Sequence, residues 1–424
     1  MKNIILVFFI ASMSAITADS HACSMCKVTI NGRTYLGNNE DSWRMGSTVW
    51  FENGGEGKLG AVYFGYSDHF PQGGMNEAGL AYDGLTTLPK PIKNIAGKKS
   101  VTSPTEFLKA IMQSCRTVED VYKYAIQYNR QQHFNHGELL FADPSGNYLV
   151  MESDTIILGK NPTYIIANFC PSITSEKEKL NWARYGRGHQ FIQNNTTDTN
   201  GFRYTLALTD TMHECREKLG DGTMYSFVAD LQNRDISLYF YHDFSRPIKF
   251  NLTSELEKGD HQVDMVSMFP ANGEFRALTS FKTPRNTIWI AAFLMCAGTL
   301  FFISALYFTI DIILSAIKKR NGPFKNLKPV LVVLGFALCY YMYQLLSNAA
   351  ILFSPAPYRD VSFSLLDIAA YLPYVCLLII LPMIYAATRI IKNPEWNILS
   401  KGMVMLNILA CMILTGLFYY WKMF

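Results

Sequence analysis

Apolar and polar positions are distributed differently in two parts of the chain. Up to about residue 285, short apolar runs alternate with polar turns, whereas beyond Arg285 charged residues become scarce and four long apolar stretches follow. Each stretch reaches the roughly 20 apolar residues that a membrane-spanning helix needs. We therefore predict four spanning helices, at about residues 287–317, 329–353, 365–391 and 403–421.

The first part combines the patterns of short strands and amphipathic helices. "KVTI" and "TYLGNN" flank Asn31 and Gly32, which favour a hairpin turn. Capping residues at Ser103 and Thr117 predict two helix starts, and helical periodicity returns over residues 175–193 and 204–219. Further strands are predicted in "STVWF", "KLGAVYFGY", "GLAYDGL", the hairpin "ELLFADPSGNYLVME", "TMYSFVADL" and "DISLYFYH". Strands and helices in alternating groups indicate an α+β fold built on antiparallel sheets.

Residues 1–22 have the three parts of a secretory signal peptide. Lys2 gives a basic start, residues 4–16 form an apolar run, and Ser20 and Ala22 stand where a signal peptidase requires small side chains. An uncleaved anchor is the alternative, but the run is shorter than a spanning helix requires. Cleavage after Ala22 would make Cys23 the first residue of the mature chain.

Basic residues between the apolar stretches predict how the chain is oriented in a membrane. The positive-inside rule puts loops rich in Lys and Arg in the cytoplasm. Residues 23–285 would then form an exported domain on the periplasmic or extracellular side, and residues 286–424 the membrane region. The basic residues lie between the first two stretches (Lys318, Lys319, Arg320, Lys325 and Lys328) and between the last two (Arg389, Lys392 and Lys401).

Net charge and histidine spacing argue against some classes of function. A net charge of +4 without runs of like charge argues against nucleic acid as a partner. His133, His136 and His213 lack the spacing of metal ligands, so neither a metal nor a cofactor is expected. Five of the nine cysteines lie in the predicted exported domain, where disulfides can form. We leave their pairing open.

A cysteine at the start of a mature chain carries its own base. The α-amine has a pKa of about 7.7–8.0, so near neutral pH it can take the thiol proton directly or through a water molecule. Removal of the leader would thus create the base that activates Cys23. The alternative is that Cys23 is one half of a disulfide, for example with Cys26.

Several segments resemble those of a known enzyme family. "CSMCKVTINGRTYLGNNEDSW" resembles the start of N-terminal-nucleophile (Ntn) hydrolases of the choloylglycine hydrolase and penicillin acyltransferase type, in which a nucleophilic cysteine precedes a hairpin and a "GxNxD" segment. "GGMNEAGLAYDGL", "IIANF", "ARYGRG" and "TMYSFVADL" are similar to later segments of the family, in the same order. The resemblance implies an αββα four-layer sandwich of antiparallel sheets and hydrolysis of linear amide C–N bonds.

The resemblance also implies roles for four residues. Cys23 would attack the amide carbonyl, and Asp41 would hold the α-amine through a charge-assisted hydrogen bond. Asn168 would donate its side-chain amide to the developing oxyanion. Arg184 would lie near Cys23 and lower the pKa of its thiol, with Arg187 as the competing candidate.

Two candidate substrate-binding positions depart from the bile-salt hydrolases of this family. Asn38 stands where those enzymes carry an arginine, and Thr86 where they carry an asparagine. Asn38 is closer to the amide of the acyltransferase branch, so acyl transfer is an alternative to hydrolysis. We expect a small-molecule N-acyl amide as substrate, with a lipid-like acyl chain because a tethered site meets such molecules at high local concentration. A further alternative is a non-catalytic domain that senses a ligand for the membrane helices.

Overall fold

In a computed structural model, the chain folds into two compact units, one ending at Ser280 and the other running from Phe281 to Phe424. The structure describes residues 23–42, 46–93, 97–195, 199–215, 222–318, 327–348, 350–353 and 365–424. The predicted signal peptide, residues 1–22, lies outside the described residues, and so do residues 319–326 of the first basic connection.

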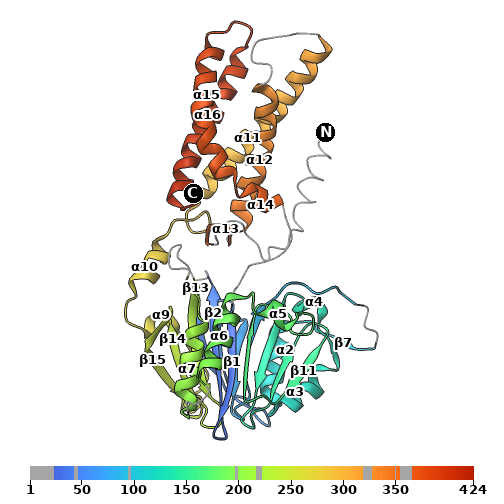
Figure 1. Cartoon of the computed structure of the whole chain (residues 1–424), viewed down its shortest axis with the longest axis vertical. Helices are drawn as coiled ribbons and strands as arrows, with labels where there is room; N and C mark the ends of the chain where they lie inside the picture. Colours follow the sequence, from blue (N-terminus) through green and yellow to red (C-terminus); the bar gives the residue numbers. More distant parts are fainter. Residues whose placement is uncertain are drawn as a thin grey trace. The chain divides into compact units, whose positions relative to one another are not determined.

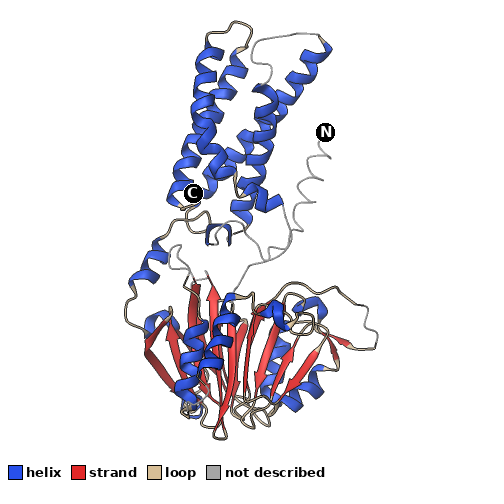
Figure 2. Ribbon diagram, viewed as in Figure 1, coloured by secondary structure: helices blue, strands red, loops and turns tan. Residues whose placement is uncertain are grey.

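One large antiparallel sheet of the first unit begins with the predicted hairpin (Figures 1 and 2). Asn31 (φ 52°) and Gly32 (φ 74°) both adopt the left-handed conformation that a tight hairpin turn requires. The six strands are β1 (Ser24–Ile30), β2 (Arg33–Ser42), β12 (Thr163–Ala167), β13 (Gly222–Asp230), β14 (Asp235–Phe240) and β15 (Asp243–Asn251). Their order in space is β12-β1-β2-β13-β14-β15, so the hairpin β1–β2 lies inside the sheet.

The other large sheet has eight strands, also paired antiparallel throughout the described residues. The strands are β3 (Ser47–Glu52), β4 (Ala61–Tyr66), β5 (Pro71–Asn76), β6 (Ala81–Thr86), β9 (Gly137–Ala142), β10 (Tyr148–Met151), β11 (Ile156–Gly159) and β16 (His261–Asp264). Their order is β11-β10-β9-β6-β5-β4-β3-β16. The short strands β7 (Lys99–Ser100) and β8 (Tyr128–Asn129) form a separate parallel pair.

Helices cover the outer face of each sheet (Figure 1). The helices α2 (Pro104–Ser114) and α3 (Val118–Ala125) begin at the predicted caps Ser103 and Thr117, and their apolar residues pack against the eight-stranded sheet. The helices α6 (Ala183–Asn194) and α7 (Gly201–Met212) pack against the six-stranded sheet. The shorter helices are α4 (Gln131–Phe134), α5 (Glu176–Lys179), α8 (Leu252–Leu256), α9 (Met265–Met268) and α10 (Gly273–Ser280).

The inner faces of the two sheets meet through aromatic side chains. Phe64 of β4 stacks on Phe227 of β13 with ring centroids 4.6 Å apart, and the ring centroids of Tyr66 and Tyr225 are 6.2 Å apart. These rings exclude water between the sheets, so polar groups on the same faces are buried as well. The layer order is helices, sheet, sheet, helices. The predicted α+β fold, a sandwich of antiparallel sheets followed by apolar helices, is confirmed.

Two predicted helices of the first unit have different bounds. The single helix expected over residues 175–193 is divided into α5 and α6, because Trp182 is extended (φ −79°, ψ 110°) and its ring packs 6.1 Å from Phe169. The helix expected to reach residue 219 ends at Met212, because His213 is extended (φ −67°, ψ 163°). Local periodicity did not reveal either interruption.

The second unit contains four helices, α11 (Ile288–Ile317), α12 (Leu327–Ser347), α15 (Leu372–Ile391) and α16 (Ile398–Tyr420), that are long and apolar enough to cross a membrane. The third predicted stretch is wrong as one continuous helix. It forms α14 (Leu365–Ala369) and α15, because Pro373 has no backbone N–H to donate to the preceding turn. The second stretch ends at Ser347, and α13 (Ala350–Phe353) follows it.

Candidate functional site

Cys23 immediately precedes β1, which lies between β2 and β12. On one side Ser24 is opposite Asn39 of β2, and on the other side it is opposite Ala167 of β12. One further step of antiparallel register brings Glu40 and Asn168 opposite Cys23, on its two sides. Residues that are far apart in the sequence therefore flank the candidate nucleophile.

The thiol of Cys23 is buried beside a carboxyl group. Its side chain is 2% exposed, and its Sγ donates to Oε2 of Glu40 at 3.3 Å. Burial, and then the negative charges of Glu40 and Asp41, raise the pKa of the Cys23 thiol well above its usual value. In this state of the chain the sulfur is a protonated thiol, so a base is needed before it can act as a nucleophile.

Asp41 is the centre of a polar network at the end of β2. Arg184 Nη1 donates to Oδ2 of Asp41 at 2.8 Å, and the Thr223 hydroxyl donates to Oδ1. Arg184 Nη1 also lies 3.4 Å from the carbonyl oxygen of Cys23. A single guanidinium thus contacts both the carboxylate of Asp41 and the backbone of Cys23.

The two candidate arginines have different environments. Arg184 is 12% exposed and points to Asp41, whereas Arg187 is 42% exposed and donates to the backbone oxygens of Thr211 and His213. Arg184 is therefore the arginine near Cys23. Burial and the two carboxylates raise the pKa of the Cys23 thiol, so a lowering by Arg184 stays a prediction.

Asn168 follows β12 and contacts the end of β6 in the other sheet. Its Nδ2 donates to the backbone oxygen of Thr86 at 2.8 Å. This contact fixes the orientation of the amide side chain. Thr86 is half-buried and takes part through its backbone. Two predicted site residues, Asn168 and Thr86, are therefore in direct contact.

Asn38 is less suited to bind a substrate than the sequence suggests. It is fully buried between the sheets, and its Nδ2 donates to Oδ2 of Asp83 at 2.7 Å. Burial, and then the charge of Glu40, raise the pKa of the Asp83 carboxyl well above its usual value. Asn38 therefore belongs to a buried polar group that connects the sheets.

Sequence reasoning missed three residues of this region. Glu40 contacts the thiol, Thr223 contacts Asp41, and Asp83 contacts Asn38. Glu40 and Asp83 both stand inside segments that carry the family resemblance, but a motif gives no role to its variable positions. The alternating pattern of β2 was the available signal, because it predicts that residues 38 and 40 share a face.

The cysteines of the first unit are not joined by disulfides. All nine cysteines of the chain fall within the described residues, and each has a free thiol. The disulfide between Cys23 and Cys26 that the sequence left open is absent here. The Cys26 thiol instead lies 3.3 Å from the Thr209 hydroxyl. The site thus combines a thiol, carboxylates, a guanidinium and an amide N–H, the groups that acyl transfer to a nucleophile requires.

No protein-family model matches the sequence, and no curated protein matches it. Two variants of the conjugated bile acid hydrolase from Clostridium perfringens are similar in structure, each at 13% identity, with TM-scores of 0.46 and 0.45. Both alignments cover 59% of this chain and 97% of the hydrolase. Penicillin V acylase from Agrobacterium tumefaciens is 14% identical, with a TM-score of 0.40, and its alignment covers 57% of this chain and 86% of the acylase. At this identity the likeness concerns the fold and assigns a role to no residue.

Proposed function

We propose that the chain is a membrane-anchored amidase of the Ntn-hydrolase type, which hydrolyses a linear N-acyl amide through a thioester on Cys23. The nucleophile becomes competent when residues 1–22 are removed and Cys23 acquires a free α-amine. The observation that carries the proposal is the contact of Arg184 with both the Asp41 carboxylate and the Cys23 carbonyl. This contact holds the first mature residue beside the acid that the proposed mechanism needs.

The first step is proton transfer within Cys23. The α-amine accepts the thiol proton, directly or through a water molecule, which gives a thiolate beside an ammonium group. The ammonium charge opposes the effect of Glu40 and Asp41 and stabilises the thiolate. Asp41 in turn stabilises the ammonium group, while Arg184 and Thr223 keep the Asp41 carboxylate in position.

The thiolate then attacks the amide carbonyl. The side-chain amide of Asn168, which the contact with Thr86 orients, donates to the oxyanion of the tetrahedral intermediate. The C–N bond breaks, the leaving amine takes the proton from the α-ammonium, and the acyl group remains as a thioester. Water, activated by the α-amine, hydrolyses the thioester and restores the thiol. With an amine in place of water, the same intermediate gives acyl transfer.

The membrane helices and the basic connections support an extracytoplasmic site. We assign residues 23–285 to the periplasmic or extracellular side, as the positive-inside rule predicts from the loops that carry Lys318 and Lys392. A small N-acyl amide with an apolar acyl chain is the favoured substrate, because an anchored site meets membrane-associated molecules at high local concentration.

The experiment identifies the N-terminal residue of the mature chain and measures its amide-hydrolysing activity. The full chain is purified from membranes, its N-terminus is sequenced, and release of amine is measured for a panel of fatty-acyl and phenylacetyl amides. We expect Cys23 as the first residue and an acyl-enzyme adduct on Cys23 by mass spectrometry. Cys23→Ser should lower turnover by at least about 10³-fold, because a hydroxyl is a much weaker nucleophile than a thiolate.

The control is Cys26→Ser, on β1 and three residues after Cys23, which should keep its turnover. A bulky substitution at the cleavage position, Ala22→Phe, should leave the leader attached and abolish activity while Cys23 is intact. A mature chain that begins before Cys23 but hydrolyses amides, or a Cys23→Ser variant with normal turnover, would refute the mechanism.

A further inference from the structure

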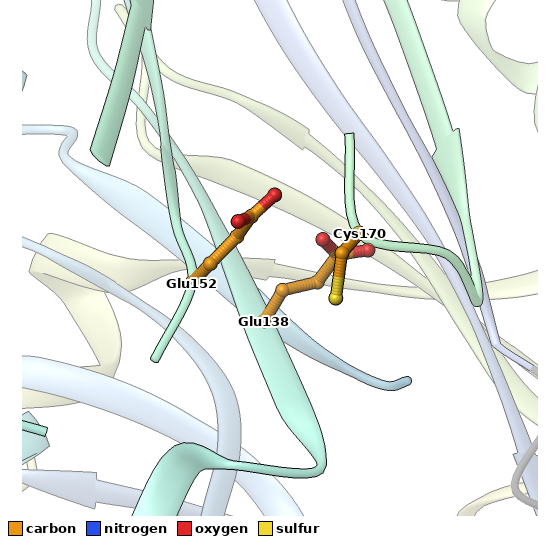
Figure 3. A group of neighbouring side chains, drawn as sticks. All are labelled: Glu138, Glu152 and Cys170. Atoms are coloured by element: carbon orange, nitrogen blue, oxygen red, sulfur yellow. The ribbon is translucent and has the colours of Figure 1, made fainter. Parts of the chain in front are cut away.

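Three potential metal ligands, far from Cys23 in the sequence, lie close together in the structure. Glu138 lies on β9, Glu152 follows β10 and Cys170 follows β12. Each offers a ligand atom, and these atoms lie within 4.8 Å of one another. Figure 3 shows the carboxyl group of Glu138 beside the side chain of Cys170, with Glu152 on the neighbouring segment. Both sheets thus contribute to one buried cluster.

Glu138 gives this cluster an unusual feature. Its side chain is 1% exposed, and neither carboxyl oxygen has a hydrogen-bond partner among the residues that the structure describes. Burying a carboxyl group without a hydrogen-bond partner costs several kcal/mol of free energy relative to its hydrated state. Such a group in a folded protein therefore calls for an explanation, for example an ion bound to it. A bound cation would supply the missing partner.

We propose that Glu138, Glu152 and Cys170 bind a zinc ion. Zinc binds thiolate sulfur at about 2.3 Å and carboxylate oxygen at about 2.0–2.2 Å in tetrahedral geometry, which separates neighbouring ligand atoms by about 3.5 Å. The ligand atoms lie within 4.8 Å of one another, so they would approach by at most about 1.3 Å to reach that geometry. The thiolate favours zinc over magnesium or calcium, and a water molecule would fill the fourth position.

The environment of Glu152 supports a ligand role. Ser172 donates its backbone N–H to Oε1 at 2.9 Å and its hydroxyl to Oε2, and Lys90 Nζ donates to Oε2 at 2.7 Å. Oε2 accepts two of these hydrogen bonds and Oε1 accepts one, so Oε1 keeps a lone pair with which the oriented Glu152 can bind a metal. Lys90 also forms an ion pair with Asp154, which offsets its positive charge near the cation.

The proposed zinc would attach the segment that carries Asn168 to the neighbouring sheet. Cys170 follows Asn168 by two residues, and its Sγ lies 3.4 Å from the hydroxyl of Thr87, the residue after Thr86. Glu138 is opposite Leu85 on β6, next to Thr86. A metal bound here would link the two sheets beside the contact between Asn168 and Thr86. Its role is structural, because none of its ligands contacts Cys23 in the described structure.

The test uses the full chain in detergent after removal of metals with a chelator. Zinc is added, excess ion is removed, and bound zinc is measured by elemental mass spectrometry. We expect one zinc per chain. Cobalt serves as a spectroscopic probe, since coordination by Cys170 gives a thiolate-to-cobalt charge-transfer band. Glu138→Gln and Cys170→Ser should each weaken zinc binding by more than about 100-fold, and Cys170→Ser should abolish the band.

The matched control is Cys115→Ser, another buried cysteine of this unit, which should bind zinc and cobalt as the unaltered chain does. Glu138→Gln removes a buried carboxyl that has no hydrogen-bond partner, so it should fold without metal, and thermal unfolding checks this directly. A chain that retains no stoichiometric zinc overturns the proposal. A charge-transfer band that persists in Cys170→Ser overturns it as well.

Discussion

At the residue scale, Glu40 determines how readily Cys23 loses its proton. The Glu40 carboxylate lies 3.3 Å from the thiol and is the largest electrostatic contribution, after burial, to the raised thiol pKa. Glu40→Gln keeps the shape and removes the negative charge, so the thiolate becomes easier to form. The rate of Cys23 alkylation by iodoacetamide, followed against pH, should therefore reach its midpoint at a lower pH than in the unaltered chain.

Cys26 provides an internal control in the same samples. Cys26 lies on β1, three residues after Cys23, and burial raises the pKa of its thiol to about 11 without a contribution from any carboxylate. Peptide mass spectrometry measures the alkylation of both thiols, and the pH dependence of alkylation should change only for Cys23. An unchanged or higher midpoint for Cys23 would mean that Glu40 does not carry a negative charge beside the sulfur.

Arg184 and Arg187 provide a second comparison on one helix. Arg184→Ala leaves the 1%-exposed Asp41 carboxylate without its cation, which should lower the free energy of unfolding by about 3–5 kcal/mol. Arg187→Ala removes an exposed side chain and should change the free energy of unfolding by less than about 1 kcal/mol. Denaturant-induced unfolding of both variants measures the difference. Equal losses would show that the Asp41 pair does not stabilise the domain.

At the element scale, the close packing of β2 against α7 depends on Gly37. A Cβ at this position would lie 2.1 Å from the Thr209 hydroxyl oxygen and 2.8 Å from the Cys26 sulfur. Gly37→Ala should therefore lower the free energy of unfolding by about 1–3 kcal/mol, and adding Thr209→Ala should restore part of it. Gly137→Ala, with its nearest atom at 3.4 Å, should be nearly neutral. Additive effects of the first two substitutions would contradict the steric explanation.

Elements with local signals were predictable from sequence, whereas contacts between elements were not. The turn at Asn31 and Gly32 and the caps at Ser103 and Thr117 are determined by neighbouring residues, so the hairpin and both helices appear where expected. The pairing of Asn38 with Asp83 joins different sheets, and only the packed sandwich brings these residues together. The same limit hid the cluster of Glu138, Glu152 and Cys170, whose spacing resembles no metal motif.

At the scale of the whole molecule, α11 is longer than the hydrocarbon core of a membrane is thick, and an ion pair lies on the part that would extend beyond the core. The helix has 30 residues and is about 45 Å long, whereas the hydrocarbon core of a bilayer is about 30 Å thick. A span of about 20 residues from Ile288 ends near Tyr307, so Asp311 would lie in the headgroup region. There its carboxylate pairs with Lys328 at 2.6 Å, which makes a charge on this apolar helix tolerable.

The proposed orientation puts this ion pair on the cytoplasmic side and the first unit outside. We expect a cysteine introduced at the exposed Glu119 to react with a membrane-impermeant maleimide in intact cells. A cysteine introduced at the exposed Lys392, between α15 and α16, should react only after the membrane is permeabilised. Peptide mass spectrometry distinguishes each site from the native cysteines. Labelling of Lys392→Cys in intact cells, with Glu119→Cys protected, would reverse the orientation and contradict an extracytoplasmic amidase, because the leader that exposes the Cys23 amine is removed only from an exported chain.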